Sequence, residues 1–433
     1  MENINFSDKV KLIAEDNLGK NSISQIKTKA NNYLLLNNLP TLKHEDWKYT
    51  NLAFFKKFNF EFDMAFNSDF NPDNFKIKDL DAYHIFSLNG KLNLEISDYP
   101  ENIIIKELDS EIEIDNIEDI RKTYFSQLNT AMFKNSIFLE VKKNQQIDKP
   151  IHIIHINDGN SNDIAINSRR FFNFADNTEA TIIESFFAVG ENKSFFNGVA
   201  EVNVGENAVI HHVKLQQDEN SDILIDFVQA QQAKYSNYVN LTFTNGGNFV
   251  RNNLNARLND ENIESHFLGV FIGDGNNVID NHTFVDHAKP NCFSNENYRG
   301  ILFDKSTGIF NGKILVRPDA QKTNAYQSNK NILASKDATI NTKPELEIYA
   351  DDVKCSHGAT SGSLDKSSLF YLRARGIDEI KAESLLMNAF VSEVVDELKN
   401  QQLKNYLHSI TRKKLNDDLH FVDEEDLINI NDL

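Results

Sequence analysis

The feature that most constrains this chain is a long succession of short extended segments between about Ala131 and Gly362. Segments such as SIFLEV, PIHIIHI, AVIHHVKL, NYVNLTF and HFLGVFIG are separated by turn sequences rich in Asn, Gly and Asp, a pattern typical of a strand-rich domain. No helical period long enough to form βαβ units lies between them. The pattern predicts a mainly β domain and leaves a sandwich, a barrel and a solenoid of stacked coils as alternatives.

The region before this domain, residues 1–130, is predicted to mix helices with short strands. Ser7 is placed to cap one helix, and Ser24 a second helix that ends before Pro40. Trp47, which follows His and Asp, could suggest a ligand-binding cluster, but a lone Trp in this setting is more often a packing anchor. We therefore assign no chemistry to this region.

The region after the β domain is predicted to be helical, so that the β core spans residues 131–363 and a helical domain residues 364–433. Asp365 is a suitable N-cap and Gly376 a suitable C′ residue for a first helix, and Asp378 can cap a second. The second helix carries an apolar face broader than one neighbouring helix usually covers, formed by Leu385, Leu386, Met387, Phe390, Val391, Val394, Val395 and Leu398. Beyond Asn405 the charged tail is expected to fray.

Charge and length exclude several classes of protein. With 433 residues the chain exceeds the usual size of one compact core. Its net charge of −19 and pI near 5.1 disfavour direct binding to nucleic acid or anionic lipid. The N-terminus MENINFSDKV lacks the features of a secretory signal, and no apolar run is long enough to cross a membrane. We expect a cytoplasmic protein.

A Cys-x-His pair stands where the β domain gives way to helices. The segment from Val353 to His357 is predicted to be a strand, so Cys355 and His357 point to the same face. A thiolate and an imidazole are ligands that iron, zinc and iron–sulfur clusters accept, although such sites generally need about four. The alternative is a buried thiol beside an ordinary hydrogen-bonded imidazole.

The remaining candidate ligands are not arranged for a shared site. Cys292, the other cysteine, follows His282 and His287 across a proline turn, and no regular strand or helix would bring the three together. Two cysteines exclude a disulfide framework and a four-cysteine cluster, and fit a reducing compartment. The histidines of the β segments are interpreted as ordinary strand residues: His152, His155, His211 and His212.

Several catalytic motifs are absent from the sequence. It contains no GxxxxGK[ST] loop, so the chain has no visible means of hydrolysing nucleotide. It also lacks HExxH, GxSxG and GxGxxG sequences in a suitable context. Long β domains rich in Asp and Glu can cleave polysaccharides, which leaves an enzyme as a competing hypothesis, but no carboxylate pair stands out.

Five segments together closely resemble the SufB/SufD family of iron–sulfur cluster assembly scaffolds. The resemblance is carried by LPTLKHEDWKYTNL (39–52), FNFADNTEATIIESF (172–186), VDHAKPNCFSNENYRGILF (285–303), NGKILVRPDAQKTNAYQSNKNILAS (311–335) and ELEIYADDVKCSHGATSGSLDKSSLFYLRARGI (345–377). Within the family, the modest length, the N-terminal Trp47 segment and CSHGAT in place of a Glu-bearing segment favour the SufD branch over SufB.

The resemblance implies both a fold and a function. The fold is a right-handed parallel β-helix between an N-terminal α/β region and a C-terminal helical domain. The function is that of a non-catalytic subunit which assembles and transfers an iron–sulfur cluster together with a SufB-like subunit and the ATPase SufC. SufC would bind the C-terminal helices, with Leu369, Phe370, Leu372, Leu386, Phe390 and Val394 as candidate contacts. A helical hairpin packed on the β domain remains the alternative for these helices.

The same resemblance marks His357 as the more important residue of the Cys-x-His pair, with Cys355 supporting it. Iron or a cluster is expected to rest only transiently at the subunit interface, with further ligands from the SufB-like partner, and not to be held stably by the isolated chain. Cys292→Ser is expected to leave assembly nearly intact. Whether iron, persulfide or a finished cluster contacts this chain stays open at this point, as does a SufB-type assignment.

Overall fold

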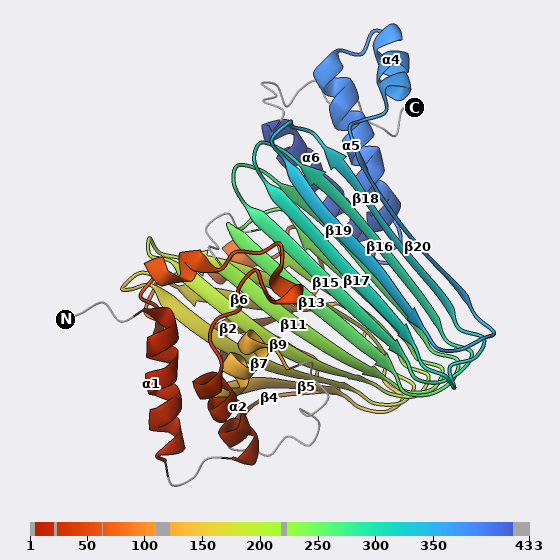
Figure 1. Ribbon diagram of the computed structural model, residues 1–433. Helices are drawn as coiled ribbons and strands as arrows, with labels where there is room; N and C mark the ends of the chain where they lie inside the picture. Colours follow the sequence, from red (N-terminus) through yellow and green to blue (C-terminus); the bar gives the residue numbers. More distant parts are fainter. Residues whose placement is uncertain (1–4, 21–23, 63, 110–121, 218–222, 419–433) are drawn as a thin grey trace.

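The fold is a flattened parallel β-solenoid formed by two facing sheets, with helices packed on both sides (Figure 1). The computed structural model describes residues 5–20, 24–62, 64–109, 122–217 and 223–418. The chain alternates between the two sheets, so each coil contributes one strand to each. The parallel β-helix that the family resemblance implies is confirmed.

Sheet A has the strand order β19-β17-β15-β13-β11-β9-β7-β5-β4, and β1 pairs with β7 at its side. Its strands are β1 (Glu61–Phe62), β4 (Ile103–Asp109), β5 (Asn135–Val141), β7 (Ile164–Phe174), β9 (Ser194–Val204), β11 (Ile223–Gln232), β13 (Phe249–Leu258), β15 (Val278–His287), β17 (Thr307–Val316) and β19 (Thr339–Ile348).

Sheet B has the order β20-β18-β16-β14-β12-β10-β8-β6-β2-β3. Its strands are β2 (Tyr83–Leu88), β3 (Lys91–Asn93), β6 (Ile151–Asp158), β8 (Glu179–Val189), β10 (Val209–Gln216), β12 (Asn237–Thr244), β14 (Glu264–Gly273), β16 (Phe293–Leu302), β18 (Asn324–Leu333) and β20 (Lys354–Gly362). Strands β2, β3 and β4 come from the N-terminal region, so this region extends the sheets as well as carrying helices.

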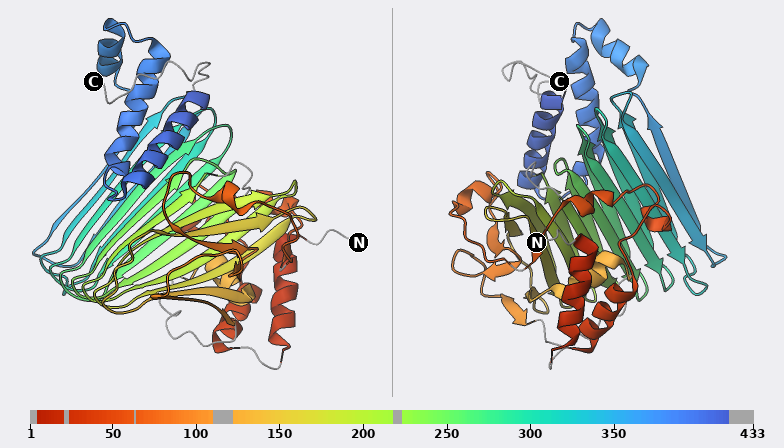
Figure 2. Two further views of the ribbon diagram at one scale, coloured as in Figure 1. Left: turned by 180° about the vertical axis from the view of Figure 1, so that it is seen from behind. Right: turned by 60° about the vertical axis from the view of Figure 1, so that its left-hand side comes forward.

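The helices come before and after the solenoid strands in the sequence and pack against the solenoid (Figure 2). They are α1 (Phe6–Leu18), α2 (Gln25–Leu36), α3 (Tyr124–Met132), α4 (Lys366–Ala374), α5 (Glu379–Val395) and α6 (Gln401–Asp418), with short 3₁₀ turns at η1 (Glu45–Trp47), η2 (Ala53–Lys57) and η3 (Pro72–Phe75). None of the helices in the described ranges is long and apolar enough to cross a membrane.

Successive coils stack in register, which turns the sequence into columns of equivalent side chains. His212, for example, lies opposite Ile182 on one neighbouring strand and Asn240 on the other. At one corner the stacked residues adopt the left-handed conformation, with φ of 57° at Asn177 and 56° at Asn207. The amide of Asn207 donates to the side-chain oxygen of Asn177 over 2.9 Å. The Asn-rich turns thus serve stacked coils, because Asn tolerates this conformation and hydrogen-bonds locally.

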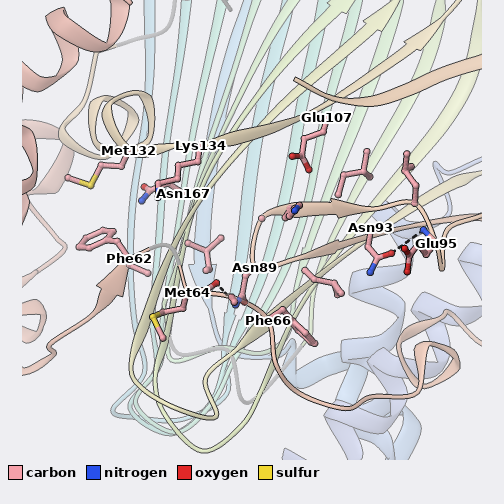
Figure 3. Close-up of a pocket in the computed structure, with 18 residues that line it drawn as sticks. Phe62, Met64, Phe66, Asn89, Asn93, Glu95, Glu107, Met132, Lys134 and Asn167 are labelled. Atoms are coloured by element: carbon pink, nitrogen blue, oxygen red, sulfur yellow. Dashed lines mark hydrogen bonds between the residues drawn. The ribbon is translucent and has the colours of Figure 1, made fainter. Parts of the chain in front are cut away.

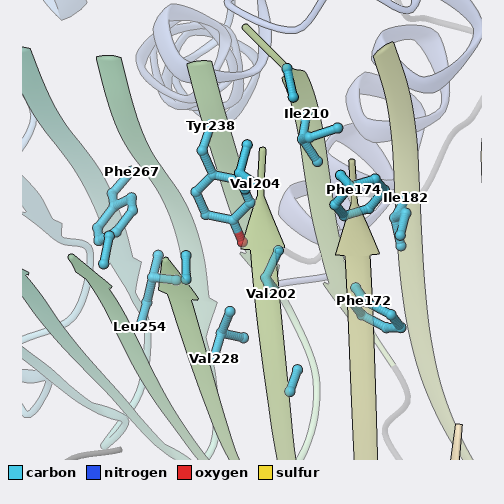
Figure 4. Close-up of a cluster of buried hydrophobic side chains, with 14 of the residues drawn as sticks. Phe172, Phe174, Ile182, Val202, Val204, Ile210, Val228, Tyr238, Leu254 and Phe267 are labelled. Carbon is cyan, nitrogen blue, oxygen red and sulfur yellow. The ribbon is translucent and has the colours of Figure 1, made fainter. Parts of the chain in front are cut away.

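The space between the two sheets is filled by apolar side chains that point inward from both (Figure 4). The cluster includes Phe172, Phe174, Ile182, Val202, Val204, Ile210, Val228, Tyr238, Leu254 and Phe267, all of them buried. Burial of such columns is the main stabilising term of a solenoid, since each coil covers the apolar edge of the next. The stacked core therefore fixes which residues share a column at either end.

Different helices cover the outer faces of the two sheets. Residues of α1 and η2 join Trp47 and Phe125 in an aromatic cluster over sheet A. Trp47 is 4% exposed, and the guanidinium of Arg251 lies 3.8 Å from the centre of its ring. Helices α5 and α6 bury Met387 and Leu407, among others, against the outer face of sheet B. The interpretation of Trp47 as a packing anchor is consistent with this burial.

Most helix boundaries follow the capping signals in the sequence. Ser24, Asp365 and Asp378 each accept a backbone N–H at the start of α2, α4 and α5, and Gly376 is left-handed at φ 89° after α4. The prediction that Ser7 caps the first helix is wrong. The N-cap of α1 is Asn5, whose side chain accepts a hydrogen bond from the Asp8 N–H.

The prediction that the chain frays beyond residue 405 is also wrong as far as Asp418. Helix α6 continues to Asp418, because its own residues Leu407, Thr411 and Leu415 are fully buried on the face that packs against the rest of the chain. Residues 419–433 of the same tail lie outside the described ranges.

Candidate functional site

The candidate ligands lie at the last coil of the solenoid, which we call the open end and define as β19 and β20. In the part of the chain that the structure describes, each of these strands has a hydrogen-bonded strand neighbour on one side only. The residues of β20 are exposed apart from Cys355, and those of β19 are exposed or partly exposed. The open end therefore presents polar backbone groups and the inner surface of the last coil to the outside.

Cys355 and His357 are both on β20 and share its inner face. Cys355 is paired in register with Ala325, and His357 with Gln327. Both of these neighbours are buried, and Cys355 itself packs against the interior apolar cluster. The alternation of side chains along a strand then places His357, two residues further on, on the same inward side. The structure thus confirms the predicted strand and the shared face.

The environments of the two side chains differ. The Cys355 side chain is partly buried, and this burial raises the pKa of its thiol above the ordinary value, although a backbone hydrogen bond at Ala325 opposes the rise. His357 is exposed, and its imidazole makes no hydrogen bond within the described residues. A neutral imidazole needs no proton loss before it binds iron, whereas a thiol with a raised pKa must first give up its proton.

A buried polar group that the sequence analysis missed lies behind His357. Glu296 is fully buried one strand beyond Gln327, and its Oε2 accepts hydrogen bonds from Gln327 Nε2 (2.9 Å) and Thr283 Oγ1 (2.6 Å). Burial raises the pKa of the Glu296 carboxyl to about 7, although the two hydrogen bonds oppose the rise. No signal along the chain could have found this group, because its members are brought together only by the stacking register.

The residues predicted to bind a partner through the C-terminal helices fall into two sets. Leu369, Phe370 and Leu372 on α4 and Leu386 on α5 are partly or largely exposed, and Phe370 is 75% exposed. Leu372 and Leu386 line an open hollow together with Tyr371. Helix α4 and the start of α5 project past the edge of the sheets (Figure 1). These residues are accessible to a partner.

Phe390 and Val394 instead face the chain's own β-sheet. Val394 is fully buried between α5 and sheet B, and Phe390 packs partly against the same cluster, with the Arg299 guanidinium 4.8 Å from its ring centre. The helical hairpin packed on the β domain, which the sequence left as an alternative, therefore accounts for the broad apolar face of α5, whose residues are buried or partly buried. The exposed apolar residues of α4 need another explanation.

Cys292, His282 and His287 make separate contacts, as expected. Cys292 is buried, its Sγ donates to the Asp260 carbonyl oxygen over 3.2 Å, and burial raises the pKa of its thiol to about 11. His282 contacts Asp280, and His287 hydrogen-bonds to the Ser294 hydroxyl. Within the described residues, no group of three or more His, Cys, Asp or Glu side chains could hold a metal ion.

Three of the strand histidines, His152, His155 and His212, make hydrogen bonds to buried polar side chains. His152 hydrogen-bonds to Ser185, and burial lowers its pKa to about 3. His155 and His212 both contact the carboxylate of Glu184, at 3.1 and 2.8 Å. Arg170 also binds Glu184 over 2.6 Å, so a charged group lies fully buried inside the solenoid. The sequence analysis treated these histidines as ordinary strand residues and could not foresee that two of them share one carboxylate.

A hollow of about 930 Å³ lies at the opposite end of the solenoid (Figure 3). It is bordered by Phe62, Met64 and Phe66, by the β2–β3 hairpin with Asn89, and by Met132. Its described lining contains no histidine or cysteine. Nothing in this lining resembles the Cys-x-His pair at the open end.

Comparison with known proteins matches two family models along the chain. Residues 155–390 match the SUF system FeS cluster assembly SufBD core domain, and residues 5–153 match the SufBD protein N-terminal region. The iron-sulfur cluster assembly protein SufD of Escherichia coli is 32% identical over 86% of this chain and 88% of its own length. A SufBD family protein of Synechocystis is 31% identical over 85% and 86%, and SufD of Bacillus subtilis 27% over 66% and 66%.

Proposed function

The chain belongs to the SufBD family of SUF-system iron–sulfur cluster assembly proteins, and from this membership we propose how it works. It is a SufD-like scaffold subunit, non-catalytic in itself, that helps to build a cluster and pass it on. It pairs through its open end with a SufB-like subunit. A SufC-like ATPase bound to the chain supplies the ATP hydrolysis that drives assembly. Iron, sulfide and the finished cluster are its cargo.

The observation that carries this proposal is the position of Cys355 and His357 on the bare last coil. An imidazole and a thiol that share the inner face of β20 can reach a group brought up to the open end by a second protein. Two ligands leave coordination positions that cysteine or carboxylate side chains of a partner can fill. The unpaired edges of β19 and β20 offer that partner a ladder of backbone hydrogen bonds.

Within the site, His357 is the first ligand for iron and Cys355 the supporting one. His357 is exposed and so is accessible to iron, whereas partial burial favours the protonated thiol of Cys355. Metal binding releases this proton once iron is present, because a thiolate is the form that coordinates. His357 therefore sets the iron affinity, and Cys355 adds to it.

The ATPase binds the projecting end of the C-terminal helices. Phe370 is 75% exposed on α4, and Leu372 and Leu386 line the hollow beside it. Exposed aromatic and aliphatic side chains around a hollow are typical anchors of protein interfaces. Because α5 also packs on β14 and β16, a movement of these helices would act on the solenoid directly.

A polysaccharide-cleaving enzyme, the competing hypothesis, is not favoured by the carboxylates of the solenoid. Glu184 and Asp226 are fully buried in contact with Arg170, and Asp280 is fully buried in contact with Arg251. A general acid and a nucleophile must instead face a groove that a sugar chain can enter. The 32% identity to a protein named SufD, over most of both chains, likewise favours the SufD branch over SufB.

The test is iron and cluster loading of the complex in the absence of oxygen. The full chain is co-expressed with the SufB-like and SufC-like subunits, and His357→Ala is compared with His266→Ala, a control on β14 in the same sheet. We expect His357→Ala to leave complex formation and ATP hydrolysis unchanged and to lower bound iron at least about tenfold. Normal iron and sulfide content in the His357→Ala complex would refute the proposed function.

A further inference from the structure

The column of residues behind His357 contains a hydrogen-bond acceptor with no partner. In this column Glu296, Gln327 and His357 follow one another on the neighbouring strands β16, β18 and β20. Gln327 is 3% exposed, and its carboxamide oxygen Oε1 is buried without a hydrogen bond in the described structure. A buried carbonyl oxygen without a donor costs roughly 1–3 kcal/mol, so its persistence calls for a reason.

The direction in which the Gln327 carboxamide points is fixed by its other end. Nε2 donates to the carboxyl oxygen of Glu296, which Thr283 holds in place from the opposite sheet. A carboxyl oxygen that already accepts from a hydroxyl favours the amide nitrogen over the amide oxygen as its next partner, because the oxygen has no proton to give. With Nε2 committed to Glu296, Oε1 is the atom left free for the neighbouring strand β20.

The opposite sheet leaves room for this carboxamide and for little else. Gly312 on β17 faces Gln327, and a Cβ at Gly312 would lie 2.2 Å from Nε2 and 2.8 Å from the amide carbon of Gln327. The φ of Gly312 is not in the left-handed region, so the backbone conformation does not require glycine here. The space that the missing side chain leaves is what allows the Gln327 amide to lie as it does.

We propose that Gln327, anchored by Glu296, is a positioning residue for His357, and that its Oε1 accepts the N–H of one imidazole nitrogen when the open end is covered. The other nitrogen then directs its lone pair toward the cargo iron. This inference rests on the proposed function, because it assumes that His357 binds iron. Histidine ligands generally donate their second N–H to a carboxylate or carbonyl oxygen that fixes the tautomer and the ring orientation.

The arrangement explains why a costly group lies behind an exposed ligand. A carboxyl group buried at Glu296 would be expensive to retain if it served packing alone. Because Glu296 is hydrogen-bonded to Thr283 and Gln327, it restricts the orientation of the Gln327 carboxamide, whose Oε1 is the proposed partner of His357. Within the described residues, His357 has no strand beyond it to restrict its ring.

The first arm of the test is a set of substitutions in the assembled complex, with anaerobic Fe²⁺ titration as the readout. Gln327→Met keeps the volume and removes both hydrogen-bonding groups, and we expect about tenfold weaker iron binding. Gln229→Met, at a buried glutamine on β11, is the matched control, with unchanged iron binding.

The second arm distinguishes positioning from a general structural effect. If Gln327 acts through His357, the double variant His357→Ala/Gln327→Met binds iron as weakly as His357→Ala alone, because there is no imidazole left to orient. Additive losses in the double variant would overturn the inference, as would wild-type affinity in Gln327→Met. If Gln327→Met fails to assemble, Gly312→Ala displaces the same amide from the opposite sheet and must show the same non-additivity.

The two proposals fail in different ways. Weak iron binding by His357→Ala together with normal binding by Gln327→Met rejects the positioning role and leaves the proposed function standing. Normal iron binding by His357→Ala rejects the proposed function, and the positioning role with it.

Discussion

The two ends of the solenoid are finished in different ways. At the first end, sheet A terminates in β4, antiparallel to β5, and sheet B in the three-residue β3, antiparallel to β2. At the other end, sheets A and B stop at β19 and β20, which are 10 and 9 residues long and parallel to their neighbours. β20 is largely exposed, and β19 is exposed or partly exposed.

The difference indicates where this chain meets another protein. Natural sheets usually shorten, reverse or cover their edges, because an exposed edge invites unwanted pairing, and solenoids usually carry a capping element at each end. Here the antiparallel strands close one end, and the other carries Cys355 and His357 on its inner face. An end that is bare and also presents candidate metal ligands supports the proposed interface.

The largest expected effect concerns the body of the solenoid. Glu184→Gln should lower the free energy of unfolding by about 3–5 kcal/mol, because the buried cations Arg170 and Lys214 are then left with the single carboxylate of Asp226. The Arg170 guanidinium and the two histidines hold the pKa of Glu184 well below its usual value despite the opposing effect of burial. Urea unfolding at pH 7 measures the loss.

The matched control for Glu184→Gln lies at the open end. Glu345 on β19 contacts Lys343 over 2.7 Å and is 37% exposed at its side chain, so Glu345→Gln should cost less than about 1 kcal/mol. Similar losses for the two variants would show that burial of the ion pair does not determine its contribution to the free energy of unfolding.

The pH dependence of stability provides a second test, at the group behind the open end. The pKa of Glu296 rises from 4.5 to about 7 on folding, so between these pH values the folded state binds more protons than the unfolded state. Its stability therefore falls as pH rises through this window, by about 3 kcal/mol in total.

Glu296→Gln should remove this loss, because a carboxamide oxygen can still accept from Thr283 and Gln327 without ionising. The variant is expected to match the wild type near pH 4.5 and to exceed its stability at pH 8 in urea titrations at both pH values. A parallel pH dependence of the two proteins would show that the carboxyl is already ionised in the folded state.

The third expected effect separates the exposed apolar residues of α4 from the apolar face of α5 that packs on sheet B. Phe370→Asp should weaken binding of the SufC-like subunit about 30-fold, roughly 2 kcal/mol, without changing the melting temperature, because the side chain is exposed. Phe390→Asp should instead lower the melting temperature, since Phe390 packs on the chain's own core.

The control for Phe370→Asp is Leu36→Asp, which places the same charge on an 84% exposed apolar residue of α2, outside the C-terminal helices. Calorimetric titration of the ATPase measures the affinity of each variant. Equal weakening by Leu36→Asp would mean that the added charge, and not the lost contact, is responsible.

The smallest expected effect tests the corner that runs along the whole solenoid. Tyr235 and Lys322 adopt φ of 58° and 59° at positions where other coils have Asn. Tyr235→Asn and Lys322→Asn should each raise the free energy of unfolding by about 0.5–1 kcal/mol, because Asn tolerates this conformation better. Urea unfolding of both single variants measures the gain. A loss of stability in either variant would show that its side-chain contacts outweigh the backbone strain.

Local signals in the sequence predicted what depends on neighbouring residues. The caps at Ser24, Asp365 and Asp378 and the shared face of Cys355 and His357 follow from short-range rules, and the structure agrees with them. The choice of a solenoid over a sandwich or barrel came from the family resemblance, because the β segments carry no strict short repeat.

Long-range contacts could not be predicted in the same way. All eight residues of β6 are buried, so alternation along the strand does not show which ones face the interior. Glu296 and Gln327 are 31 positions apart and meet only through the register of stacked coils. The apolar face of α5 gave no sign that Val394 would lie against sheet B, since the position of that sheet is a property of the fold.

The central claim is that the open end is where a SufB-like subunit binds and completes the cluster site. Hydrogen–deuterium exchange on the full chain, alone and in complex, tests it most directly, with peptides from β20 (Lys354–Gly362) compared with peptides from β4 (Ile103–Asp109). We expect strong protection of the β20 amides in the complex and no change at β4. Unchanged exchange at β20, or protection confined to the first end, would contradict the account.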